Sequence, residues 1–118
     1  MADQREALLS LLNALERAHR KALPLLADPG LLDQEAGQDA LDVICMQFLA
    51  AGEALKRLDR LSPGQLQERF PQIDWKGAMG FRDVIAHQYF DLDAEQILVI
   101  CQQSLPGLID AVQDLLEG

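Results

Sequence analysis

Apolar residues recur at intervals of three and four along four stretches of this chain, and this period limits the folds open to it. The stretches run over about residues 3–26 and 38–61, from Asp74 through Ile85, and from Asp93 through Leu115. Such spacing places apolar side chains on one face of an α-helix, whereas a strand requires alternation, which no segment shows. The sequence therefore predicts an all-α fold, a four-helix up-and-down bundle with one additional short helix at about residues 64–70.

Capping residues and prolines predict where these helices begin and end. Pro24 is expected to kink or end the last turn of the first helix, and Pro106 is expected to kink the last helix. Ser62 followed by Pro63 predicts the start of the short helix, because proline is accepted in a first helical turn. Aspartate side chains cap helix N-termini by accepting backbone N–H groups. The expected N-caps are Asp3, Asp74 and Asp93.

The length of 118 residues predicts a single domain, residues 1–118, with one core. Cys45 and Cys101 fall on predicted apolar faces, which favours free buried thiols over a disulfide and fits the reducing cytoplasm, the expected location. No apolar run approaches the ~20 residues that a membrane span needs. The mixed charges of the first residues predict no signal peptide.

The net charge of −9 is unusual for a protein that binds nucleic acid, but the charges are unevenly distributed. Residues 1–55 hold 4 basic and 9 acidic side chains, and residues 83–118 hold 7 acidic and no basic ones. Residues 56–82 hold 6 basic and 3 acidic side chains. Positive charge therefore leads into the motif described next, although solvated helix faces would explain it equally well.

One short motif, Arg82-x4-His87-x-Tyr89, carries most of the chemistry in the sequence. It combines a permanent cation with an acid/base that works near neutral pH and a phenol. A guanidinium binds phosphate oxygens and an imidazole moves protons, so the set suits reactions of a phosphate ester. Taken alone, the spacing is also compatible with an exposed arginine and a partly buried histidine.

Helical geometry relates the side chains of this motif to one another. Asp83 and His87 are four residues apart and share a face, so the carboxylate is expected to raise the pKa of the imidazole and fix its tautomer. Arg82 and His87 are separated by about 140° on an ideal helix. Either the helix loosens near Ala86, or the two residues act together across an interface between two copies of the chain.

The motif resembles the Arg-x4-6-His signature of HEPN ribonucleases, and the added tyrosine resembles the HepT toxin branch. Three further blocks support the resemblance: residues 49–56 with their Gly-Glu-Ala segment, residues 70–75 with Pro-x-Ile-x-Trp, and residues 89–93. The family usually has asparagine directly after the arginine, whereas this chain has Asp83. That acid adds negative charge beside any bound phosphate.

The resemblance implies a HEPN-like bundle that forms a homodimer with its site in the cleft between two subunits. It implies a type VII-like toxin that cleaves RNA without a metal or other cofactor, with Arg82 stabilising the phosphate and His87 transferring the proton. DNA is not a substrate, because the reaction uses the ribose 2′-hydroxyl, and no membrane partner is expected. The implied antitoxin is a cognate minimal nucleotidyltransferase of the MntA type, which silences the toxin by adenylylating Tyr89.

A second function of a different class is a non-catalytic helical partner of a nucleotidyltransferase, which Asp83 and the acidic net charge favour. Glu53 is a supporting residue that either pairs with Arg57 four residues on, the favoured arrangement, or faces the cleft. Gly52 within a helix predicts close packing of a second helix there. Tyr89 alone would also fit the edge of a core, and no cluster with ligand spacing predicts a metal site.

Overall fold

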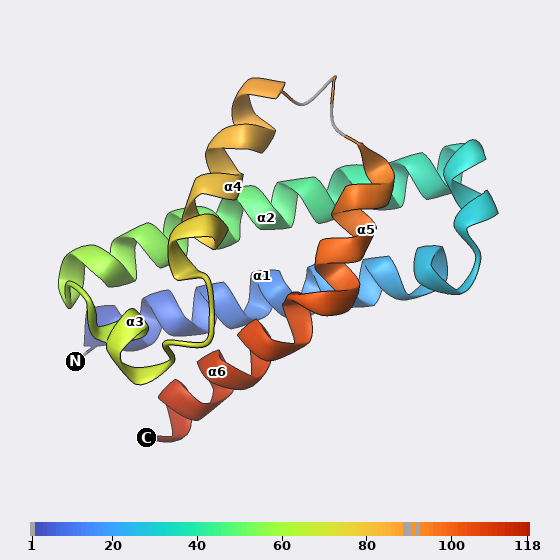
Figure 1. The fold of residues 1–118 in the computed structure, drawn as a ribbon. Helices are drawn as coiled ribbons and strands as arrows, with labels where there is room; N and C mark the ends of the chain where they lie inside the picture. The colour runs from blue at the N-terminus through green and yellow to red at the C-terminus, as the bar shows by residue number, and fades with distance from the viewer. Residues whose placement is uncertain (1, 89–90, 92) are drawn as a thin grey trace.

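The computed structural model describes residues 2–88, 91 and 93–118, and this part of the chain is helical almost throughout (Figure 1). No strand occurs in the described residues, which confirms the prediction of an all-α fold. None of the helices described is long and apolar enough to cross a bilayer. The elements are α1 (Ala2–Ala27), the 3-10 helix η1 (Pro29–Asp33), α2 (Glu35–Leu61), α3 (Gln65–Arg69), α4 (Trp75–Gln88), α5 (Ala94–Gln103) and α6 (Leu105–Glu117).

Two of the three predicted aspartate caps are confirmed by their hydrogen bonds. Asp74 precedes α4, and its Oδ1 accepts from the backbone N–H of Gly77 at 2.9 Å. Asp93 precedes α5 and accepts from the N–H of Glu95 at 3.0 Å. The predicted cap at Asp3 is wrong, because α1 begins one residue earlier. Asp3 lies instead in the first turn, where a negative charge is favourable beside the helix N-terminus.

The helix ends near proline and glycine differ in part from the prediction. α1 continues for one turn past Pro24 and then ends. Ser62 is the C-cap of α2, and the residue before α3 is Gly64, whose φ of +78° lies in the left-handed region that favours glycine. The predicted last helix is two helices, separated at Ser104, because Pro106 takes a position in the first turn of a new helix.

The bundle is built on α1 and α2, which run side by side in opposite directions (Figure 1). α4 packs on α2, while α5 and α6 pack on α1. Apolar side chains from all five of these helices form one core cluster, and its largest fully buried members include Trp75, Leu11, Leu55, Ile97 and Val112. The core therefore holds α4 at Trp75 and at Ile85, and in Figure 1 the last turn of α4 extends beyond α2.

The two cysteines are free and buried, as the sequence predicted. Burial, and to a smaller extent the negative charge of the nearby Asp42, raises the pKa of the Cys45 thiol to about 11. Burial likewise raises the pKa of the Cys101 thiol to about 12. Both groups stay protonated near neutral pH, so they act as core side chains rather than as nucleophiles.

Candidate active site

The motif helix α4 carries Arg82 in its middle and His87 in its last turn. The side chain of Arg82 is 32% exposed, and His87 is exposed. The helix runs without interruption through Gln88, so the first of the two alternatives, a helix that loosens near Ala86, does not hold. Within one chain, Arg82 and His87 therefore stay on different faces of a regular helix.

Gly52 of α2 lies directly beneath Arg82 and sets the distance between the two helices. A Cβ atom added to Gly52 would lie 2.4 Å from Cβ of Arg82 and 2.9 Å from its Cγ. The missing side chain therefore lets the stem of Arg82 rest against the backbone of α2. The predicted close packing at Gly52 is confirmed.

We expect Gly52→Ala to lower the free energy of unfolding by up to about 2 kcal/mol. Overpacking costs about 1–3 kcal/mol, and the higher helix propensity of alanine returns about 1 kcal/mol of it. The matched control is Gly80→Ala on α4, where an added Cβ meets nothing within 4 Å. Urea denaturation should show Gly80→Ala at least as stable as the wild type. A Gly52→Ala protein as stable as Gly80→Ala would contradict the close contact.

Two carboxylates hold the guanidinium of Arg82. Its Nε lies 2.8 Å from Oε1 of Glu53, and its Nη1 lies 3.2 Å from Oδ1 of Asp83. The contact with Glu53 is an ion pair rather than an aligned hydrogen bond, because the buried Nε–H has no hydrogen-bond partner in the structure as described. The favoured pairing of Glu53 with Arg57 is wrong, since the packing of α4 on α2 brings Arg82 to this carboxylate instead.

Lys56 is a member of this site that the motif analysis missed. Its Nζ lies 3.2 Å from Oδ1 of Asp83 and 3.5 Å from Oδ2. Hydrogen bonds from Lys56, and then from Arg82, lower the pKa of the Asp83 carboxyl. The expected pairing of Asp83 with His87 is wrong, because the partners of this carboxylate are the two cations. A signal was present: Lys56 stands one turn after Gly52, so both face α4.

The charges of this site cancel in sum, with Glu53 and Asp83 opposing Lys56 and Arg82. All four side chains are at least 31% exposed, so these ion pairs exchange readily with ions from solution. Across the described ranges, no three His, Cys, Asp or Glu side chains gather in a way that could hold a metal ion. Tyr89, the predicted modification site, lies outside the described residues.

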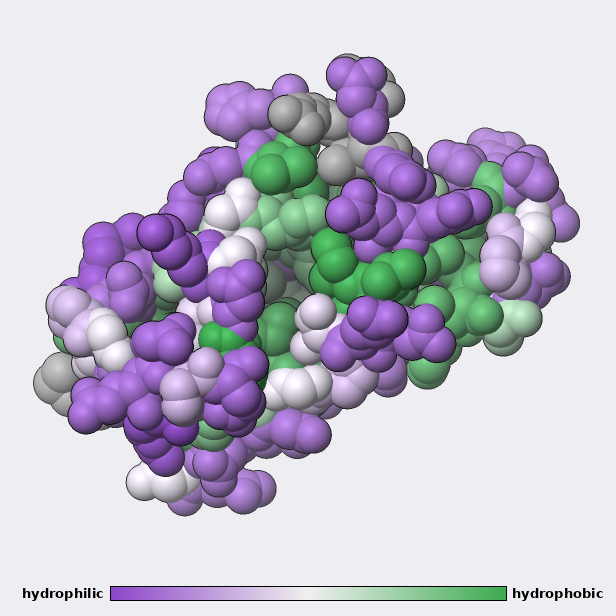
Figure 2. Space-filling view, in the orientation of Figure 1, coloured by the Kyte–Doolittle hydropathy of each residue, from purple (hydrophilic) through white to green (hydrophobic). Residues whose placement is uncertain are grey.

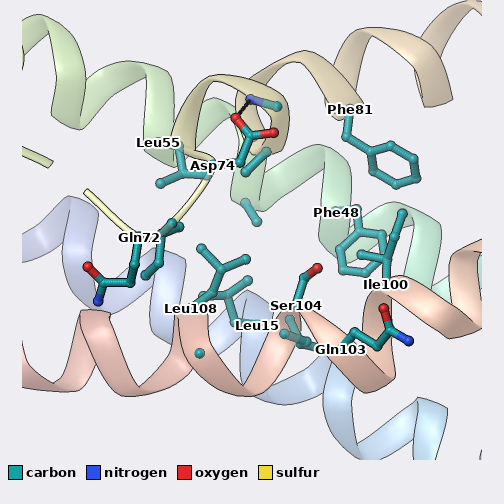
Figure 3. A pocket seen from close by; sticks show the side chains of 17 residues that line it. Leu15, Phe48, Leu55, Gln72, Asp74, Phe81, Ile100, Gln103, Ser104 and Leu108 are labelled. Carbon is teal, nitrogen blue, oxygen red and sulfur yellow. Dashed lines mark hydrogen bonds between the residues drawn. The ribbon is translucent and has the colours of Figure 1, made fainter. Parts of the chain in front are cut away.

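A cleft of about 580 Å³ separates α4 from α5 and α6, within the ~300–1,000 Å³ typical of ligand sites. Figure 2 shows the hollow with apolar side chains along its walls. In Figure 3, Phe48, Phe81, Leu55 and Leu108 line its interior, and the amides of Gln72 and Gln103 lie at two ends. The rings of Phe48 and Phe81 meet edge to face at 5.7 Å. Gly52 also lines the cleft, so it adjoins the Arg82 site.

A comparison with protein families matches residues 11–115 to the family described as "Ribonuclease HepT-like". The chain belongs to this HepT-like family. The match covers Glu53, Lys56, Arg82, Asp83 and His87, and therefore the whole charged site. The family resemblance seen in the sequence is thus confirmed, while the antitoxin partner stays a prediction.

Relatives of this HepT-like chain include "Putative RNase MJ0127" from Methanocaldococcus jannaschii, 32% identical over 66 residues that cover 56% of this chain and 51% of that protein. "Putative RNase TTE0752" from Caldanaerobacter subterraneus subsp. tengcongensis is 30% identical over 66 residues, covering 56% of this chain and 55% of that protein. The chain thus spans about half the length of these curated relatives. No solved structure matches the chain significantly.

Proposed function

We propose that this HepT-like chain is a metal-independent endoribonuclease and the toxin of a type VII-like HEPN/nucleotidyltransferase pair. The observation that carries the proposal is that Arg82, in the middle of α4, and His87, in its last turn, are both reached by solvent in a chain matched to a ribonuclease family. The names of its relatives also contain the word RNase. RNA is the proposed substrate and DNA is not.

The proposed reaction is an internal transfer followed by release of a 5′-hydroxyl. The ribose 2′-oxygen attacks phosphorus, its proton leaves to a base, and the bond from phosphorus to the 5′-oxygen breaks as that oxygen gains a proton. His87 is suited to one of these proton transfers, and Arg82 stabilises the charge that builds on the phosphate oxygens. The products are a 2′,3′-cyclic phosphate and a 5′-hydroxyl, and neither transfer needs a metal ion.

A homodimer would bring the two groups of the site together. Arg82 and His87 are about 140° apart on an unbroken helix, so one subunit does not readily direct both at a single phosphate. A second copy packed about a two-fold axis would supply the other group. The extension of α4 beyond the bundle and the apolar cleft beside it are consistent with such packing (Figures 1 and 2).

In the proposed pair, a cognate minimal nucleotidyltransferase silences the enzyme by transferring adenylate to Tyr89. Tyr89 follows Arg82 by seven residues in the sequence, a spacing of about two turns of an ideal helix, which favours an added phosphate on the side of Arg82. The new negative charge would fill the phosphate site and repel RNA. The pair is expected to act in the cytoplasm.

A non-catalytic partner subunit that binds a nucleotide is the second candidate function. It is favoured by the two carboxylates that neutralise Arg82 and by the net charge of −9, both of which weaken RNA binding. This function predicts a stable complex with a co-expressed nucleotidyltransferase and no change in RNA. Failure of the two proteins to co-purify would remove it.

The test of the ribonuclease proposal uses one single-stranded RNA and the same oligonucleotide with 2′-deoxyribose at every position. We expect cleavage of the RNA alone, with 2′,3′-cyclic phosphate ends and no loss of rate in EDTA. The matched control is Arg69→Ala, which removes an exposed arginine outside the charged site and should leave cleavage intact. Intact RNA at every ionic strength tried, or cleavage of the deoxy strand, would overturn the proposal.

A further inference from the structure

One oxygen of Asp83 lies between two cations that come from different helices. Its Oδ1 is 3.2 Å from Nζ of Lys56 on α2 and 3.2 Å from Nη1 of Arg82 on α4. A lysine and an arginine that converge on one oxygen form the usual environment of a bound phosphate oxygen. In this structure the oxygen belongs to a carboxylate of the chain itself.

The packing of α2 against α4 holds the two cations in this arrangement. Gly52 fixes the stem of Arg82 against α2, and Glu53 takes the Nε edge of the guanidinium. The Nη1 group of Arg82 is thereby free to contact the oxygen that Lys56 also contacts. Lys56 lies on the same face of α2 as Gly52. Helix packing therefore brings Lys56 of α2 and Arg82 of α4 within reach of one shared oxygen.

We propose that Lys56 and Arg82 form a two-cation site for a phosphate-type oxyanion, which the carboxylate of Asp83 occupies in the free protein. The inference rests on the proposed function only in naming the natural anion, an RNA phosphodiester. Asp83 is a competitor for the site, and Lys56 is a second phosphate contact. Any phosphate that binds there must first displace Asp83.

Displacement is feasible because the ion pairs of Asp83 are exposed. The side chain of Asp83 is 50% exposed and that of Lys56 is 31% exposed, so both are reached from solution. Exposed ion pairs contribute little and are screened by salt. A released Asp83 side chain can turn toward water, while Glu53 stays on the far edge of the guanidinium. The two cations then keep only Glu53 as a close carboxylate, so less of their charge is neutralised and an incoming anion is favoured.

The experiment measures binding of inorganic pyrophosphate by calorimetry at low salt. Asp83→Asn keeps the shape of the side chain and removes its charge, so we expect it to bind pyrophosphate about tenfold more tightly than the wild type. Adding Lys56→Met to Asp83→Asn should remove this gain. Asp110→Asn, an exposed acid on α6 with the same change in net charge, is the control and should bind as the wild type does.

Equal affinities of Asp83→Asn and Asp110→Asn would overturn the two-cation site. A second measurement needs no variant: saturating pyrophosphate should raise the pKa of Asp83 in the wild type, observed by NMR, because its cations are taken. An unchanged pKa would also overturn the proposal. The binding assay does not depend on RNA cleavage. If Asp83→Asn binds pyrophosphate more tightly but the wild type does not cleave RNA, only the ribonuclease proposal is rejected. If the wild type cleaves RNA but Asp83→Asn and Asp110→Asn bind pyrophosphate equally, only the two-cation site is rejected.

Discussion

Replacing His87 with alanine is expected to slow RNA cleavage by roughly 10²- to 10⁴-fold, the usual contribution of a positioned acid or base. The side chain is exposed in the last turn of α4 and is absent from the core, so its removal should leave the fold intact. Initial rates on the single-stranded RNA, with circular dichroism to verify the fold, measure the effect. The control is His19→Gln, because His19 is the other histidine and lies on α1.

Mixing subunits extends this experiment to the proposed dimer. Arg82→Ala and His87→Ala subunits are each expected to be nearly inactive, but random mixing makes half of the dimers mixed. If each site takes Arg82 from one copy and His87 from the other, a mixed dimer keeps one intact site, which restores about a quarter of the wild-type activity. No restoration after unfolding and refolding the mixture would contradict a shared site, and wild-type rates of His87→Ala would contradict the role of the histidine.

The helices and two of the caps were predictable because they depend on neighbouring residues. The period of apolar residues defines a helix wherever it folds, and Asp74 and Asp93 accept N–H groups only two or three residues away. The break between α5 and α6 at Ser104 was harder to predict from the sequence. A proline inside a periodic segment permits either a kink or a new first turn, and tertiary packing decides between them.

The ion pairs were mispredicted for a single physical reason. Spacing along one helix suggested Glu53 with Arg57 and Asp83 with His87, each four residues apart. In the structure both acids instead contact Arg82, and Asp83 also contacts Lys56. The spacing rule identifies side chains that are neighbours within one helix. It gives no information about side chains of a second helix that packs against the first. Gly52 was the clue, because a glycine that admits α4 also brings the charges of both helices together.

The cleft beside the site was beyond prediction because it depends on the separation of α4 from α5 and α6. Its walls come from residues distributed over most of the chain, from Leu15 to Leu108. The sequence does indicate which stripe of α4 faces inward, since the apolar residues Trp75, Ala78, Phe81 and Ile85 recur at helical spacing. It does not give the tilt of that helix, which the packing at Gly52 and at the start of α4 determines.

Trp75 anchors the start of α4, and Trp75→Ala is expected to lower the free energy of unfolding by about 3–5 kcal/mol. The side chain is only 2% exposed and belongs to the core cluster. Its Nε1 donates to the carbonyl oxygen of Phe70 at 3.0 Å, and its ring meets that of Phe70 edge to face at 6.3 Å. The alanine variant loses the buried ring and leaves a cavity below the first turn of α4. Urea denaturation of both proteins measures the difference.

Trp75→Phe separates the buried ring from its hydrogen bond. Phenylalanine retains much of the apolar surface but lacks the Nε1 donor, while the Phe70 carbonyl keeps its hydrogen bond from the N–H of Ile73 at 3.2 Å. We therefore expect the lost hydrogen bond to cost about 0.5–1.5 kcal/mol, and the whole change to cost less than alanine does. Because the first turn of α4 orients the motif helix, both variants should also cleave RNA more slowly under conditions where they remain folded. A Trp75→Ala protein as stable as the wild type would contradict the role of Trp75 as the anchor of α4.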